Sequence, residues 1–150
     1  RSFLEITAEY PLAGYYMYSP PNGGDEAVYP LMTENDFKNE LVLAHHADEE
    51  GRWWTGVGLL NPNAYPTEIT MTPHDGSGEL AADPQTLMLS PGAYEVFTVR
   101  DRFEMMAGDI AFMTFSPAES AGAPIGGFYL YGNTGNRQIG NMKSLSGANM

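Results

Sequence analysis

The sequence predicts an all-β protein, an antiparallel β-sandwich of immunoglobulin-like or jelly-roll-like type with at most one short helical turn. Seventeen glycines and eleven prolines punctuate short segments that are rich in aromatic and β-branched residues. Turn signals recur roughly every ten residues, which is the spacing found in sandwiches and barrels. A chain of 150 residues can bury about two-thirds of its unfolded surface, so we expect residues 1–150 to form a single domain with one core.

The expected strands follow from alternation and from the residues that stop them. An Asn-Pro-Asn run at 61–63 ends one apolar segment, and a Pro and Gly cluster at 20–24 separates two others. Residues 68–72 alternate between polar and apolar, which places Ile69 and Met71 on the core face. The predicted strands are 3–8, 12–18, 27–32, 41–44, 53–60, 68–72, 86–89, 94–99, 110–115 and 126–131.

Two tight turns and one helical turn are expected between the later strands. Residues 75–78, Asp-Gly-Ser-Gly, close a hairpin because Asp and Gly tolerate positive φ values. Residues 91–92, Pro-Gly, suit the two central positions of a turn, so the strands that flank them are predicted to form a second hairpin. Residues 100–106 are the expected place of the helical turn.

A short phrase occurs twice in the chain. Residues 11–18, PLAGYYMY, recur as residues 124–131, PIGGFYLY, 113 positions later. Upstream of each copy, residues 3–8 parallel residues 110–115 at an offset of 107. The chain therefore contains a repeated structural unit.

The repeat divides the chain into three parts. Met32 falls opposite Met142 when the copies are extended downstream. A unit that begins with a copy of its own ending is typical of a window from a tandem array, or of a domain completed by the end of the preceding unit. Residues 1–32 thus resemble the end of a preceding repeat, residues 33–142 form one full unit, and residues 143–150 form a tail.

Composition excludes several classes of partner and site. Seven basic against nineteen acidic residues give a net charge of −12, whereas binding of nucleic acid needs clustered Lys and Arg. Without cysteine there is no disulfide, no thiolate nucleophile and no Cys-type metal site. No apolar run approaches the ~20 residues that span a bilayer, so membrane insertion is not expected. The chain begins at Arg1 within a predicted strand, so a targeting segment would lie upstream.

Residues 53–63 read WWTGVGLLNPN. They resemble a family of repeated bacterial extracellular β-sandwich domains, whose units carry a Trp-aromatic-Thr-Gly phrase that runs into Asn-Pro. The similarity covers residues 41–142, together with the earlier copy of the ending in 1–32. The resemblance implies a sandwich fold and a secreted bacterial location, extracellular or at the cell surface. It implies no reaction, because the family has no established catalytic role.

Alternation along the repeated strand indicates which aromatic rings are candidates for binding. In the second copy, Gly126, Phe128 and Leu130 are predicted to face the core. Tyr16 and Tyr129 then point outward, where rings stack on sugars, bury against a partner or pack along the sheet. The candidate ligand or interface residues are Tyr16, Tyr18, Trp53, Trp54, Tyr129 and Tyr131.

The two adjacent tryptophans must face opposite ways in an extended strand. Trp54 shares its parity with Gly56 and Gly58, whereas Trp53 shares its parity with Val57. We expect one indole to cover the glycine-rich face and to fill the space that the glycines leave empty. A ligand platform is the alternative.

One acidic segment resembles a metal cluster in composition. His45, His46, Asp48, Glu49 and Glu50 lie close together, but adjacent histidines on a strand diverge and none has the i, i+4 spacing of zinc proteases. We expect one packed or hydrogen-bonded histidine followed by a solvated acidic loop. The alternative is a Ca²⁺ site built from Asp48, Glu49 and Glu50. No other cofactor is expected.

No motif in the chain predicts catalysis. A Gly-x-Ser-x-Gly nucleophile elbow and a phosphate-binding loop that ends in Gly-Lys-Ser/Thr are both missing from the sequence. Asp75, Ser77 and Glu79 offer oxygens at alternate positions, but they are explained more simply as the hairpin turn. We therefore expect no catalytic residue and no enzyme.

The leading expectation is a non-enzymatic extracellular structural or interaction module. It would act in self-assembly, into a fibre or surface layer, or in adhesion, through sheet edges and exposed aromatic faces. Its partners would be copies of itself or neighbouring repeat domains. The alternative is a carbohydrate-binding module that holds a polysaccharide with exposed Tyr and Trp, and a hydrolase is the least favoured.

Overall fold

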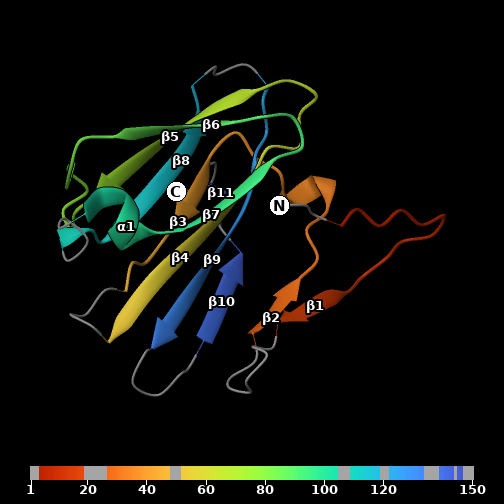
Figure 1. The fold of residues 1–150 in the computed structure, drawn as a ribbon, viewed down its shortest axis with the longest axis horizontal. Helices are drawn as coiled ribbons and strands as arrows, with labels where there is room; N and C mark the ends of the chain where they lie inside the picture. Colours follow the sequence, from red (N-terminus) through yellow and green to blue (C-terminus); the bar gives the residue numbers. More distant parts are fainter. Residues whose placement is uncertain are drawn as a thin grey trace.

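The computed structural model describes residues 4–18, 27–47, 52–104, 109–118, 122–133, 139–143 and 145–146. The chain is an antiparallel β-sandwich, which confirms the predicted fold class (Figure 1). The helical elements that lie wholly within the described residues are a 3-10 turn and a five-residue α-helix. In chain order the elements are β1 (Tyr15–Tyr18), β2 (Ala27–Pro30), η1 (Glu34–Asp36), β3 (Leu41–Leu43), β4 (Trp53–Leu60), β5 (Thr67–His74), β6 (Gln85–Leu89), β7 (Tyr94–Thr98), α1 (Val99–Phe103), β8 (Phe112–Pro117), β9 (Gly126–Asn133), β10 (Ile139–Lys143) and β11 (Leu145–Ser146).

Two sheets form the sandwich. One has the strand order β10-β9-β4-β7 and the other the order β11-β3-β8-β5-β6. The hairpin β1-β2 joins neither sheet and forms a separate two-stranded ribbon, which lies next to β10 (Figure 1). Residues 4–8, predicted to be a strand, have no regular structure and belong to the extension that projects from the sandwich ahead of β1.

Most connections cross from one sheet to the other, and this corrects one predicted hairpin. The Pro91-Gly92 turn forms as expected, with Gly92 at φ 64° and the Ala93 N–H donating to the Ser90 carbonyl at 3.0 Å. However, β6 lies at the edge of the five-stranded sheet and β7 at the edge of the four-stranded sheet, so the turn joins sheets and not neighbouring strands. A tight turn specifies a chain reversal, and it does not specify that the two strands pair.

The helical turn and the tail also have clear positions. Helix α1 covers the described part of the predicted turn, and the Thr98 Oγ1 caps it by accepting from the Asp101 N–H at 3.2 Å. The tail contains β11, which pairs with the edge of β3. Residues 105–106, 144 and 147–150 lie outside the described part of the chain.

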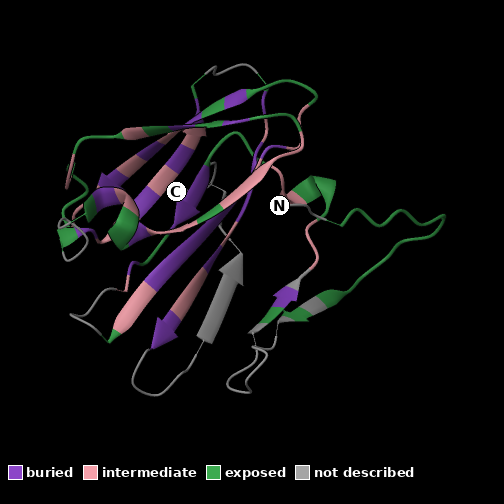
Figure 2. Ribbon diagram, in the orientation of Figure 1, coloured by how far each residue is buried: buried purple, intermediate pink, exposed green. Residues whose placement is uncertain are grey.

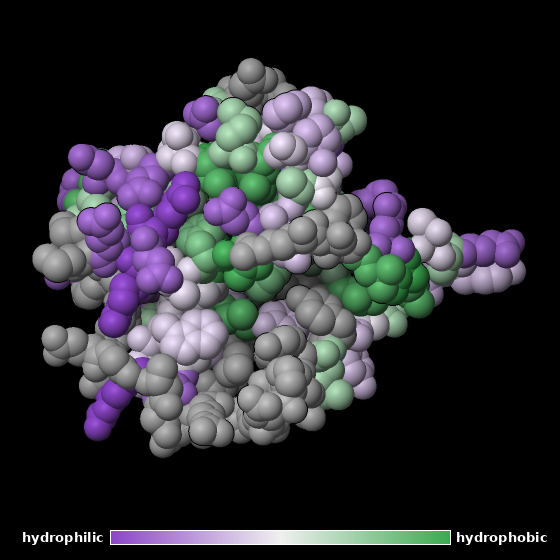
Figure 3. All heavy atoms as spheres, in the orientation of Figure 1, coloured by the Kyte–Doolittle hydropathy of each residue, from purple (hydrophilic) through white to green (hydrophobic). Residues whose placement is uncertain are grey.

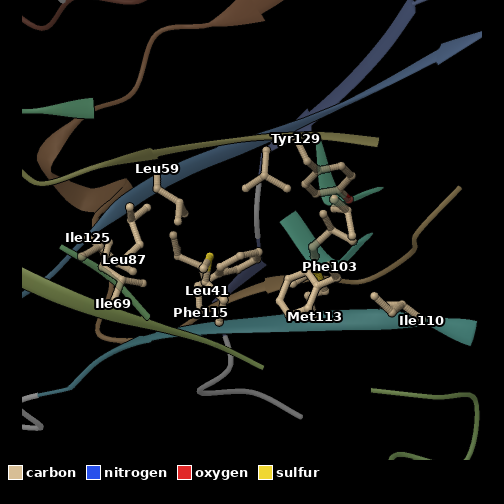
Figure 4. Packing of buried hydrophobic residues seen from close by; sticks show 14 of the residues in the cluster. Leu41, Leu59, Ile69, Leu87, Phe103, Ile110, Met113, Phe115, Ile125 and Tyr129 are labelled. Atoms are coloured by element: carbon tan, nitrogen blue, oxygen red, sulfur yellow. The ribbon is translucent and has the colours of Figure 1, made fainter. Parts of the chain in front are cut away.

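The core lies between the two sheets. Ile69 and Met71 are fully buried on one face of β5, as their alternation predicted, and Leu87 and Leu89 continue that face onto β6. Figure 2 shows buried positions alternating with intermediate or exposed ones along these strands, and Figure 4 shows the side chains meeting in the gap between the sheets. The cluster consists of Leu41, Leu43, Val57, Leu59, Ile69, Met71, Leu87, Leu89, Val99, Phe103, Ile110, Met113, Phe115, Ile125 and Tyr129.

A buried asparagine joins the ends of strands from both sheets. Asn61, fully buried after β4, donates from Nδ2 to the carbonyls of Tyr65 at 2.8 Å, Leu89 at 3.0 Å and Ser90 at 3.2 Å. Its Oδ1 accepts from the Asn63 amide N–H at 2.9 Å. The Asn-Pro-Asn run, expected only to stop a strand, therefore also holds two chain crossings together, from β4 to β5 and from β6 to β7, because it satisfies carbonyls that the crossings leave unpaired.

Asn61→Asp should destabilise the fold by about 3 kcal/mol or more at neutral pH, because a carboxylate would face three carbonyl oxygens in a buried site. The measurement is urea unfolding followed by fluorescence. Asn39→Asp, the same change at an exposed position, is the matched control and should shift the free energy of unfolding by less than about 0.5 kcal/mol. Equal losses in the two variants would contradict the role assigned to Asn61.

Candidate interaction surface

The candidate surface is best located from β9, because β9 carries the second copy of the repeated phrase. β9 pairs with β10 on one side and with β4 on the other, so both of its edges are filled. Tyr129 is 1% exposed and belongs to the core, together with Ile125. The prediction that Tyr129 points outward is therefore wrong, and Phe128 and Leu130 lie on the outer face instead.

The wrong set of alternate residues of β9 was predicted to face the core, because the side chains on both faces of β9 are apolar. On the outer face, the Phe128 ring lies over Gly58, its direct cross-strand neighbour, and leaves no room for a Cβ there. Tyr29 of the ribbon then packs edge-on against Phe128, with ring centroids 5.4 Å apart. Alternation cannot tell an inner from an outer face when aromatic residues cover both.

Trp54 repeats this arrangement and confirms the predicted role of one indole. Its ring lies over Gly132, the residue directly across from it on β9, and also contacts Gly56. A glycine that faces a ring across a strand pair lets the ring lie flat on the backbone. Trp53, on the inner-face parity of β4, is half-buried at the start of the strand.

Tyr131 is hydrogen-bonded to His45 and to Tyr129, and the adjacent His46 has a separate hydrogen bond. The Tyr131 hydroxyl donates to the His45 carbonyl, and the hydroxyls of Tyr129 and Tyr131 are hydrogen-bonded to each other. His46 is buried, with Nδ1 3.2 Å from the Ile110 carbonyl. The structure confirms the expectation of one packed, hydrogen-bonded histidine.

The acidic positions give no metal site in the described part of the chain. Asp48, Glu49 and Glu50 lie outside the described residues, and elsewhere no three His, Asp or Glu side chains gather where they could hold a metal ion. Asp75 forms the expected turn: its Oδ1 accepts from the Ser77 hydroxyl at 2.7 Å and from the Ser77 N–H at 2.8 Å. These bonds lower the pKa of the Asp75 carboxyl, the Ser77 hydroxyl contributing most.

A small apolar cavity lies between the sheets. It has a volume of about 10 Å³ and is lined by Leu41, Leu43, Val57, Leu59, Phe115 and neighbouring residues of β9. This volume suits at most one water molecule, and the lining offers such a water hardly any polar partner. The cavity is therefore a packing defect of the core and not a ligand site.

The N-terminal extension and the ribbon carry most of the exposed large apolar side chains of the described residues. Figure 3 shows a hydrophobic cluster where this part leaves the sandwich. The exposed apolar residues of this part are Leu4, Ile6, Tyr10, Leu12, Tyr15, Met17 and Val28. We call them the ribbon surface. Tyr16 and Tyr18 lie on β1, and their side chains lie outside the described part.

The ribbon has the same register as the hairpin β9-β10. Tyr16 pairs with Tyr29 on the ribbon, and Tyr129 pairs with Met142 on the sheet, so both strands of the two hairpins correspond at an offset of 113. This register corrects the alignment of Met32 with Met142, because Tyr29 is the residue that corresponds to Met142. The tyrosines of this strand were predicted as candidate interface residues, whereas Leu12 and Met17 were not. The repeat itself was the signal that could have identified Leu12 and Met17.

No family model, no curated protein and no solved structure matches this chain. Among the helices of the described residues, none is long and apolar enough to cross a membrane.

Gly132→Ala should destabilise the protein by about 1–3 kcal/mol, because the new Cβ would overlap the indole of Trp54 and force it off the sheet. Thermal unfolding and the red shift of tryptophan emission measure the two effects. Gly76→Ala is the matched control, since a Cβ there meets nothing within 4 Å. An unshifted emission spectrum and unchanged stability in the Gly132 variant would contradict the packing assigned to Trp54.

Stability should fall as the pH rises above about 10, and Tyr129→Phe or Tyr131→Phe should flatten this fall. Burial is the main cause that raises the pKa of both phenols above the ordinary value of 10.0, and at Tyr131 the neighbouring Tyr129 adds to the effect. The folded state then holds these protons more tightly than the unfolded state, so the stabilisation is complete below pH 10 and is lost as the pH rises through the folded-state values.

The measurement is the melting temperature from pH 8 to 12, together with phenolate absorbance. Tyr65→Phe, at an exposed position, is the control and should leave the alkaline slope as it is in the unchanged chain. A slope that persists in both buried variants would show that other groups cause the alkaline loss.

Proposed function

We propose that this chain is a non-enzymatic extracellular structural module that joins like modules, in self-assembly into a fibre or surface layer or in adhesion, through the ribbon surface. One observation carries the proposal: a strand sequence that packs inside the sandwich as β9 occurs again, uncovered, as β1. Leu12 is 52% exposed, whereas its counterpart Ile125 is fully buried. The resemblance to repeated bacterial extracellular domains supports the location.

The backbone of β1 also favours joining. In the described part of the chain, β1 pairs only with β2, so one edge of the ribbon presents unpaired N–H and C=O groups. Proteins that remain monomeric usually block such an edge with charge, proline or a covering loop. Here Tyr15 and Met17, both exposed, lie along it, and apolar side chains on an open edge favour pairing with another strand.

Carbohydrate binding, the alternative function, was expected from exposed Tyr16 and Tyr129 and from one exposed indole of the pair Trp53 and Trp54, and the side chain of Tyr16 lies outside the described part. Tyr129 lies in the core and Trp54 packs over Gly132, so these two rings do not form a sugar platform. The geometry favours joining of modules over carbohydrate binding.

The full chain should form oligomers whose mass rises with concentration, and Leu12→Asp with Met17→Asp should return it to a monomer, because two charges on the ribbon surface oppose its burial. Light scattering after size-exclusion chromatography measures the mass. Salt should strengthen the association, since each copy carries a net charge of −12 that screening weakens.

Leu80→Asp with Met88→Asp is the matched control. Both residues are 58% exposed but lie away from the ribbon, on and beside the edge strand of the other sheet. These changes should leave the oligomers intact. A monomer at all concentrations in the unchanged chain, or equal loss of mass in both double variants, would overturn self-assembly through the ribbon.

A further inference from the structure

We infer that residues 4–32 are the closing strands of another sandwich unit of this kind, and that their partner is a set of strands equivalent to β3 through β7 that lacks its own β8, β9 and β10. The inference deepens the proposed function by naming the partner of the ribbon surface, and it rests on the joining of like modules, not on self-assembly of this chain alone. It places residues 4–8 at the position of β8, β1 at that of β9 and β2 at that of β10.

The burial of matched residues supports this placement. Ile6 corresponds to Met113 at the offset of 107, and it is 52% exposed where Met113 is fully buried. Leu12, which corresponds to buried Ile125, shows the same contrast. The first copy therefore keeps the apolar character of core positions at places where this chain provides no core.

Glycine and aromatic positions agree with the same placement. Gly14 corresponds to Gly127, where a Cβ would come within 2.7 Å of Leu41 in the facing sheet. Tyr15 corresponds to Phe128, the ring that covers Gly58 across from it on β4. Tyr15 is 70% exposed, and its cross-strand partner on the ribbon is Pro30. The ribbon thus retains two features of β9: a glycine that leaves room for a residue such as Leu41 in the facing sheet, and an aromatic ring that can cover a glycine on a neighbouring strand such as β4.

A complete second copy does not offer this position. β4 pairs with β9 on one edge and with β7 on the other, so a finished sandwich has no free edge there. The edge of β1 left open by β2 is the edge that corresponds to the β4 side of β9. The partner must therefore present a β4 equivalent with one edge free, which is the state of a unit without closing strands.

Completion would also move the ribbon. Tyr29 corresponds to Met142, and the cross-strand partner of Met142, Tyr129, faces the core. In this chain, however, Tyr29 is 7% exposed and packs against Phe128. The ribbon face that corresponds to the core face is therefore turned toward the sandwich of its own chain. Closing another unit requires Tyr29 to leave Phe128.

The test is a fusion in which residues 33–107 precede the full chain 1–150. In this fusion residues 3–8 follow the added segment at the same distance at which residues 110–115 follow it in the chain itself. Amides of residues 5–8 and 12–18 should exchange at least about a hundredfold more slowly in the fusion than in the chain alone, because they become part of a packed sheet. The nuclear Overhauser contacts between the Tyr29 and Phe128 rings should disappear. Leu12→Asp in the fusion should abolish the new protection and leave that of β3 to β9 unchanged.

Each outcome separates this inference from the proposed function. Unchanged exchange of residues 5–18 in the fusion would overturn the inference, and the mass of the chain alone would still decide self-assembly. A protected ribbon in the fusion, combined with a chain that is monomeric alone, would keep the inference and overturn self-assembly. Protection together with loss of oligomers on fusion would support both.

A second variant tests the same placement without a fusion. Ile125→Leu, Gly126→Ala, Phe128→Tyr and Leu130→Met together make residues 125–131 identical to residues 12–18. The chain should still unfold cooperatively, with a melting temperature lowered by no more than about 10 °C, mainly because the new Cβ at 126 comes within 2.9 Å of the Phe37 ring. Loss of the cooperative transition would show that the ribbon sequence does not fit the position of β9, and would overturn the inference.

Discussion

The architecture depends on glycine residues that stand directly across from aromatic rings on β4 and β9. Phe128 covers Gly58, and Trp54 covers Gly132, so both rings lie flat on the outer face of the four-stranded sheet. This face is closed by side chains of its own strands and needs no second layer of helices. The inner face is then left to Tyr129 and its aliphatic neighbours, which pack on the five-stranded sheet. A strand that is apolar on both faces needs cover on both, and β9 has the core on one face and the Trp54 ring with Tyr29 of the ribbon on the other.

The sequence predicted the strands well because their limits are local properties. Alternation in β5 and the Asn-Pro stop after β4 lie within a few residues, and the structure confirms both. Which strands pair is not local: β6 and β7 flank a good turn but belong to opposite sheets. The side of β9 that faces the core was also unpredictable, since aromatic residues occupy both parities. The role of Asn61 in joining two connections was missed because two of its three carbonyl partners, Leu89 and Ser90, lie at the end of β6, which only the fold brings close to Asn61.

Comparison of the two copies of the repeated phrase shows which features of the hairpin do not depend on the surrounding sheet. Each copy forms the same hairpin with the same register, although one is central in a sandwich and the other is a ribbon. The hairpin therefore forms with one register both within a sheet and as a separate ribbon. The second copy lies in a sheet because β9 pairs with the edge of β4. The first copy has no strand equivalent to β4 beside it in the described part of this chain.

The cost of this exposure indicates that the ribbon surface is built to be covered. Full burial of a large apolar side chain is worth about 1.5–3 kcal/mol, so covering half of Ile6, Leu12, Tyr15 and Met17 is worth on the order of 5 kcal/mol. That value approaches the whole folding stability of a typical domain. A two-stranded hairpin alone is at best marginally stable, and Tyr29 on Phe128 is the one ring contact described between this ribbon and the sandwich. A binding partner can therefore gain much more by covering the ribbon than the chain loses when the ribbon leaves its present position.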